Sequence, residues 1–155
     1  YPDWTLEIYG DGALRPELEQ QVNRLGLSSS VILAKPTHQM KEVYQSASIY
    51  AMTSRYEGLP MVLIEAQHMG LPIVSFACPC GPKDVLHSGE DGYLISPGDD
   101  DGFLIALRQL MDSEAERVRM GANARKASAR YEVDAVMGQW LDLFSSLVPN
   151  KSTAV

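Results

Sequence analysis

The sequence predicts an α/β fold in which a parallel β-sheet is covered by helices on both faces. Two observations support this fold class. Strand-like and helix-like segments alternate along the chain, and the strands are nearly continuous apolar runs, as expected for strands buried on both faces. In such sheets ligands bind beyond the carboxyl ends of the strands, near a switch in strand order. The loops that follow the predicted strands are therefore the segments to search for a site.

The strands are predicted from short apolar runs that end at glycine, proline or polar residues. They are Trp4–Tyr9, Val31–Ala34, Ser48–Thr53, Pro72–Ala77 and Gly92–Ser96.

The helices are predicted from apolar spacing and from their end signals. In the first one, Leu18, Val22 and Leu25 recur at helical spacing, Pro16 lies in the first turn and Gly26 follows the end. The predicted helices are Glu17–Leu25, Gln39–Ser46, Pro60–Met69, a turn or two at Lys83–Ser88, Asp100–Asp112, Ala115–Lys126 and Val133–Leu147. Residues 1–148 are thus expected to form the domain, and residues 149–155 a disordered polar tail.

Composition and charge exclude several classes of protein. The chain has 155 residues, of which 45% are apolar and 21% charged, values typical of a single globular domain. Its net charge of −7 is unsuitable for wrapping nucleic acid. No apolar run approaches the ~20 residues of a membrane span, and no signal peptide is recognisable. Cys78 and Cys80 are interpreted as reduced thiols, since residues two apart close a disulfide poorly.

The most informative stretch runs from Ser54 to Ala66. Glu57 follows a predicted strand, and Gly58 allows the backbone a close approach to a ligand. The helix that opens next presents free backbone amides at Leu59, Met61 and Val62, which suit an anion. Glu65 is the one charged residue in an otherwise apolar helix, where burial of a carboxylate requires a partner. The residues alone leave two interpretations of Glu65 open: a salt bridge to a basic side chain, or a carboxylate that accepts ribose hydroxyls.

Glu57 and Glu65 stand in E-x7-E spacing within a longer pattern. Around them lie Ser54-Arg55-x-Glu57-Gly58, Glu65-Ala66, Gly70-Leu71-Pro72-Ile73-Val74, Gly81-Pro82, Gly92-Tyr93-Leu94 and Pro97-Gly98-Asp99. From about Trp4 to Leu147 the chain closely resembles the C-terminal, donor-binding half of a retaining glycosyltransferase of the two-domain GT-B architecture, in the large family 4 group. The resemblance implies a Rossmann-like domain that binds a nucleotide diphosphate sugar, with UDP expected ahead of GDP, and no cofactor or metal.

The resemblance also implies roles for individual residues. Glu65 matches the glutamate that holds the ribose hydroxyls, and Glu57 the glutamate that holds the donor hexose beside the reacting carbon. The amides after Gly58 match the diphosphate-binding segment. Gly10 and Gly12 match a glycine-rich turn after a strand, for which a plain tight turn is the alternative. Lys35, Pro36 and Thr37 match the loop whose backbone contacts the nucleobase; the family commonly has glycine at Ala34 or Lys35, so the base stays unassigned.

Other polar residues have simpler interpretations. His38 and Lys83 lie in or beside strand-end loops where ligand contacts occur, but solvated side chains are expected. His68 is expected to be a half-exposed helix residue. Asp99, Asp100 and Asp101 resemble an N-cap cluster more than a metal site.

The resemblance also concerns the parent protein. The chain begins at Tyr1, and we interpret it as part of a longer protein. The parent is expected to transfer a hexose, with retention, to an acceptor glycan or lipid-linked saccharide bound by an N-terminal domain. It is expected to be cytoplasmic, with peripheral association at the inner face of the membrane allowed, and the 155-residue fragment is expected to be inactive alone. The alternative is a non-catalytic nucleotide-binding or interaction module, since the fold alone does not decide function.

The resemblance places a further strand, preceding this chain, in the middle of a sheet of order 3-2-1-4-5-6. The strands at Trp4–Tyr9 and Ser48–Thr53 would then each lack a neighbour. Unpaired backbone groups along a whole strand are costly. The expected outcomes are therefore direct pairing of these two strands, pairing with a strand from another copy, instability of the fragment, or pairing with a strand from residues outside this sequence.

Overall fold

The structure is a computed structural model that describes residues 1–147. They divide into two compact units, one formed by residues 1–40 and the other by the remainder. Each unit is described by itself below. The proposed tail at residues 149–155 lies outside the described part of the chain.

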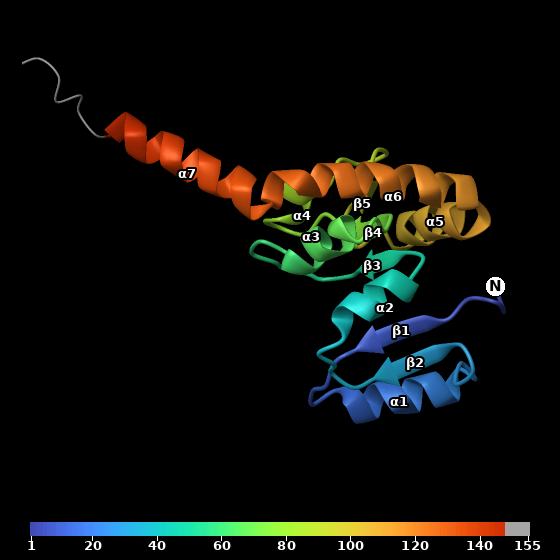
Figure 1. Ribbon diagram of the computed structural model, residues 1–155. Helices are drawn as coiled ribbons and strands as arrows, with labels where there is room; N and C mark the ends of the chain where they lie inside the picture. The colour runs from blue at the N-terminus through green and yellow to red at the C-terminus, as the bar shows by residue number, and fades with distance from the viewer. Residues whose placement is uncertain (148–155) are drawn as a thin grey trace, which may run out of the picture. The chain divides into compact units, whose positions relative to one another are not determined.

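The first unit is a β-α-β motif. Strands β1 (Leu6–Tyr9) and β2 (Val31–Ala34) pair in parallel, with Leu6 opposite Val31, and helix α1 (Arg15–Arg24) connects them (Figure 1). Pro16 lies in the first turn of α1, where its missing N–H costs nothing. Helix α1 begins two residues earlier than predicted, because Arg15 and Pro16 already adopt helical geometry.

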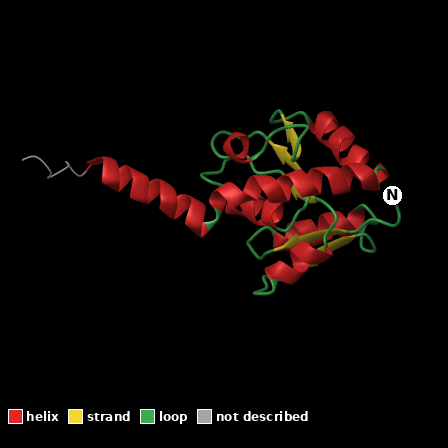
Figure 2. Cartoon of the chain, turned by 45° about the horizontal axis from the view of Figure 1, so that its top comes forward, coloured by secondary structure: helices red, strands yellow, loops and turns green. Residues whose placement is uncertain are grey.

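The second unit contains a three-stranded parallel sheet of order β3-β4-β5. Its strands are β3 (Tyr50–Met52), β4 (Ile73–Phe76) and β5 (Gly92–Ile95). The remaining helices of the chain are α2 (Met40–Ser46), α3 (Met61–His68), α4 (Pro82–Val85), α5 (Asp100–Asp112), α6 (Glu114–Ser128), the 3-10 helix η1 (Ala129–Tyr131) and α7 (Val133–Leu147). Figure 2 shows the helices in red and the strands in yellow.

The core of the second unit lies between β4 and α5. Val74 on β4 packs with Phe103 and Leu110 of α5 and with Met120 of α6, and all four are buried. Ile73 and Ser75 project to the opposite face of β4 and are also fully buried. The central strand is therefore buried on both faces, as predicted from its apolar sequence.

Two glycines allow α3 and α6 to approach closely. Gly70 follows α3 with φ +77°, a left-handed conformation that glycine adopts without strain. A Cβ on Gly121 of α6 would overlap the carbonyl oxygen of Gly70. The end of α3 and the middle of α6 thus meet backbone to backbone, which fixes the position of the helix that carries Glu65.

Strand pairing agrees with the predicted order within each sheet. β1 pairs with β2, and β4 lies between β3 and β5. How the missing neighbour of β1 and of β3 is replaced stays a prediction.

Candidate active site

Glu57 and Glu65 lie in the second unit, and both influence the same tyrosine. Burial raises the pKa of Tyr50 to about 12, and the negative charges of Glu65 and then Glu57 add to this effect. Since tyrosine ionisation is opposed by nearby negative charge, both carboxylates are within electrostatic reach of one ring. The two glutamates therefore belong to one region of this unit.

Glu65 differs from the sequence prediction in its burial. The apolar sequence of α3 suggested a buried carboxylate, but Glu65 is exposed. Helical geometry explains the error, because residues three and four apart share a face. The buried residues of α3 are Leu63, Ile64, Ala66 and Gln67, and the exposed ones are Met61, Val62, Glu65 and His68. The buried polar side chain of this helix is Gln67, whose amide donates to the Val85 carbonyl and the Asp91 carboxylate.

Glu65 has a tyrosine partner instead of the salt bridge that was one of its two interpretations. The hydroxyl of Tyr44, on α2, donates to Oε2 of Glu65 across 3.0 Å. No ion pair involves Glu65 in the described part of the chain. Burial is the main reason that the pKa of Tyr44 is raised, followed by this hydrogen bond. Sequence reasoning missed Tyr44, because the two residues are 21 positions apart on different helices and no spacing rule connects them.

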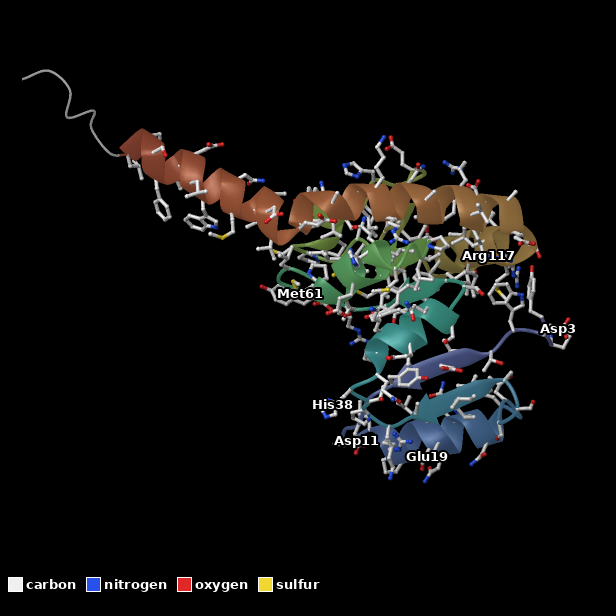
Figure 3. The ribbon with its side chains drawn as sticks, in the orientation of Figure 1. Asp3, Asp11, Glu19, His38, Met61 and Arg117 are labelled. Atoms are coloured by element: carbon white, nitrogen blue, oxygen red, sulfur yellow. The ribbon has the colours of Figure 1, made fainter. Side chains whose placement is uncertain are left out.

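The N-terminus of α3 has no side-chain cap. Pro60 occupies the N-cap with φ −74° and ψ 88°, and no side chain caps the first turn. The helix begins at Met61, one residue later than predicted, because the ψ angle of Pro60 is not helical, so the amide of Leu59 precedes the first turn. Leu59 and Met61 are each 55% exposed, and Figure 3 labels Met61 at the start of this helix. Uncapped amides and the positive end of the helix dipole together favour an anion here.

Glu57 lies in the loop between β3 and α3. Its side chain is half-buried. Burial is the main reason that the pKa of the Cys78 thiol is raised, and the charge of Glu57 is the next. Cys78, which follows β4, is buried, Cys80 is exposed, and both are free thiols. Lys83, on α4, is exposed and forms no salt bridge within residues 1–147.

In the first unit, Gly10 and Gly12 line a pocket of about 350 Å³. The pocket also receives Ile8 and Leu33 from the strands and Leu18 from α1. Gly10 has φ +155°, whereas Gly12 has no positive φ. A Cβ at either position would meet nothing within 4 Å in residues 1–147, so close packing there explains neither glycine, although the φ of Gly10 itself favours glycine.

Arg15 holds the carboxyl ends of β1 and β2 together. Its guanidinium donates to the carbonyls of Leu33 at 2.5 Å, Gly10 at 3.1 Å and Ala34 at 3.4 Å, and it pairs with Glu19 at 2.9 Å. The arginine thus fixes the start of both loops that were predicted to contact a nucleotide. Sequence reasoning did not single it out.

The loop after β2 contains Lys35, Pro36 and Thr37. Lys35 and Pro36 are exposed, and the hydroxyl of Thr37 accepts from the amide of Gln39 at 3.1 Å. His38 is exposed, and Figure 3 shows His38 and Asp11 at the same end of the β1–β2 pair, beyond the carboxyl ends of the strands. The predicted residues of this unit are therefore gathered at the expected edge of its sheet.

The acidic cluster before α5 caps that helix. Asp99 accepts from the amide of Gly102 at 2.9 Å, which confirms the predicted N-cap. Within residues 1–147 no group of three or more His, Cys, Asp or Glu side chains is arranged to hold a metal ion.

Residues 1–127 match the family model described as glycosyl transferases group 1. The chain belongs to this family. It is 37% identical over 142 residues to the amylovoran biosynthesis glycosyltransferase AmsD of Erwinia amylovora, covering 92% of this chain and 40% of that protein. It is 36% identical over 152 residues to the exopolysaccharide phosphotransferase SCO2592 of Streptomyces coelicolor, covering 97% of this chain but 16% of that protein.

Solved structures of GT-B glycosyltransferases share this fold. The Anabaena protein Alr3699/HepE in complex with UDP superimposes with a TM-score of 0.86 at 25% identity, covering 94% of this chain and 42% of that one. The predicted fold class, an α/β fold of the GT-B type covering part of a domain, is thereby confirmed. This chain spans about two fifths of the length of AmsD and HepE. Within the described residues, no helix combines the length and apolar character needed to cross a membrane.

Proposed function

We propose that this chain is the donor-binding domain of a glycosyltransferase that transfers a hexose from a nucleotide diphosphate sugar. The observation that carries the proposal is the arrangement on α3. Glu65 lies one turn after the exposed Met61 and Val62 and on the same face, and helical side chains tilt toward the N-terminus, the end to which the uncapped first-turn amides point. This order of groups suits a ribose followed by a diphosphate.

Each group has a defined part in the proposal. The carboxylate of Glu65 accepts the ribose hydroxyls, and Tyr44 fixes its orientation. The amides of Gly58, Leu59, Met61 and Val62 bind the diphosphate, which carries the negative charge that a helix N-terminus favours. Glu57 orients the hexose and stabilises the positive charge that develops at its ring during transfer.

The first unit is proposed to contact the nucleoside end of the donor. Gly10 and Gly12 allow close approach of a ligand, which gives Gly12 a reason that neither its φ nor a contact within the described residues provides. Lys35, Pro36 and Thr37 present backbone groups to the base. We propose uracil as that base, in keeping with the relative solved with UDP.

The reaction proposed for the whole protein is transfer with retention of anomeric configuration to an acceptor glycan or lipid-linked saccharide. In this scheme the leaving phosphate assists the attack, so this domain supplies no general base. The proposed location is the cytoplasm, with peripheral association at the inner face of the membrane.

The experiment is a donor screen on the full-length protein. Calorimetry with UDP and GDP tests the nucleotide, and turnover of a panel of UDP-hexoses with polysaccharide and lipid-linked acceptors tests the transfer. Nuclear magnetic resonance of the product reports the anomeric configuration. Binding of UDP without transfer to any acceptor would favour the non-catalytic nucleotide-binding module. A product in which the acceptor carries a sugar phosphate in place of a sugar would favour phosphotransfer.

A further inference from the structure

Gly81 lies in backbone contact with the loop that carries Glu57. It is buried, precedes α4 as its N-cap, and has φ +85° and ψ −62°. A Cβ at this position would overlap the Cδ atom of Pro60 and the carbonyl oxygen of Gly58. Pro60 is itself fully buried, so it has no room to retreat. A side chain on residue 81 must therefore move either α4 or the Glu57–Pro60 loop.

Helix α4 is held firmly at its other end. The carbonyl of Val85 accepts from the Gln67 side chain at 3.0 Å and from Arg130 at 2.8 Å. The carbonyl of Asp84 accepts from Arg130 at 2.8 Å and from the Tyr131 hydroxyl at 3.2 Å. The donors come from α3 and η1, both packed on α6. Gly58 and Leu59 of the loop are exposed, so the displacement is expected to fall on this exposed part of the loop and not on α4.

We propose that Gly81 is a positioning residue for the donor site. Its lack of a side chain lets the anchored α4 hold the Glu57–Pro60 loop at the position where the Glu57 carboxylate and the amides after Gly58 meet the diphosphate and the sugar. This inference rests on the proposed function and deepens it. Gly81 itself touches no donor atom; it acts through Gly58 and Pro60.

The chain provides a control for the positive φ. Gly89 has φ +86°, close to that of Gly81, but a Cβ there would meet nothing within 4 Å. Alanine at either position is forced to a positive φ, which strains an L-residue. Loss of the UDP preference in Gly81→Ala but not in Gly89→Ala therefore points to the contact with the loop.

The experiment uses the full-length protein with Gly81→Ala and Gly89→Ala, each checked for folding by thermal unfolding. Affinities for UDP and uridine are measured by ligand-observed magnetic resonance, and turnover is measured with the donor found in the screen. In Gly81→Ala we expect the preference for UDP over uridine to fall at least about tenfold and turnover by about a hundredfold, the scale of a ~1 Å misplacement. Uridine affinity stays unchanged, and Gly89→Ala keeps both preference and turnover.

Arg130→Gln tests the hydrogen bonds that hold the C-terminal end of α4. It decides whether Gly81 has a positioning role if Gly81→Ala does not fold. It removes the hydrogen bonds to the Asp84 and Val85 carbonyls and is expected to reduce the UDP preference in the same direction but less. Arg119→Gln, which removes a bond to the carbonyl of Gly89, is its control.

Two results would overturn the positioning role while the wild type still binds UDP. One is a folded Gly81→Ala protein with its UDP preference intact, and the other is an equal loss in both glycine variants. An unchanged UDP preference in Arg130→Gln counts against it if Gly81→Ala is unfolded. A wild type that binds no UDP refutes the proposed function itself, and the positioning role falls with it.

Discussion

The hydroxyl of Tyr44 and the carboxylate of Glu65 are joined by a hydrogen bond of 3.0 Å that connects α2 to α3. Tyr44 is 6% exposed, whereas Glu65 faces solvent. A buried donor thus fixes the direction of an exposed acceptor. One oxygen of Glu65 is occupied by the tyrosine, and the carboxylate keeps lone pairs for a ligand.

Tyr44→Phe should weaken nucleotide binding by about fivefold, the equivalent of one net hydrogen bond of ~1 kcal/mol. The loss arises because Glu65 becomes free to rotate away from the ribose. Calorimetry with UDP on the full-length protein measures it. Tyr93→Phe is the control, since Tyr93 donates to Glu116 at 3.2 Å in a similar tyrosine–glutamate pair on β5 and α6. Equal losses in the two variants would count against a specific role for Tyr44.

Glu65→Gln should weaken UDP binding by at least about tenfold and leave the fold intact. An exposed amide in place of the carboxylate keeps the shape but loses the charge-assisted hydrogen bonds to hydroxyl groups, which are roughly twice as strong as neutral ones. Calorimetry and a thermal unfolding curve check the two halves of this expectation. Unchanged UDP affinity would remove Glu65 from the nucleotide site.

Glu57→Ala should lower turnover far more than affinity for UDP, by about a hundredfold or more. The reason is that Glu57 is proposed to stabilise charge that develops at the sugar ring, and such preorganised groups contribute on this scale. The turnover number and the UDP dissociation constant are measured on the same preparation. Losses of equal size in both would contradict the division of roles between Glu57 and Glu65.

Asp91→Ala should lower the free energy of unfolding by about 3 kcal/mol, because a buried carboxylate that accepts two hydrogen bonds is lost. Asp91 is 2% exposed and accepts from the Gln67 side chain at 3.0 Å and from the amide of His87 at 2.8 Å. Urea unfolding measures the loss. Asp99→Ala, which removes only an exposed N-cap, should cost about 1 kcal/mol. A smaller loss for Asp91 than for Asp99 would refute the expectation.

Raising the pH should destabilise the fold through Tyr50. The pKa of Tyr50 is raised from 10.0 to about 12 in the folded protein. A raised folded-state pKa gives stability that is complete below pH 10.0 and is lost as the pH rises through about 12. Denaturant unfolding across this window, with tyrosinate absorbance as a second signal, should show a weaker decline in Tyr50→Phe. An identical decline in both proteins would place the cause elsewhere.

The order and type of the helices and strands follow from local properties of the amino-acid chain. Alternating apolar segments with proline and glycine end signals act within a few residues, so α5 begins and ends where it was predicted, α7 begins where it was predicted, and β1, β3 and β4 are two or three residues shorter than predicted. The E-x7-E spacing of Glu57 and Glu65 is likewise a property of the chain itself, and it marks the segment in which the candidate site lies.

Packing, in contrast, selects which side chains are buried and which groups meet. The sequence indicated that Glu65 was the buried polar residue of α3, but packing against α4 and the loop before β5 buries Gln67 and leaves Glu65 exposed. The face of a helix that is buried depends on the elements that pack against it. In a short, mostly apolar helix the difference in hydropathy between the faces is too small to reveal which face that is. The Tyr44–Glu65 bond and the contact of Gly81 with Gly58 and Pro60 join residues 21 or more positions apart, where no local periodicity acts and only the packed fold brings the groups together.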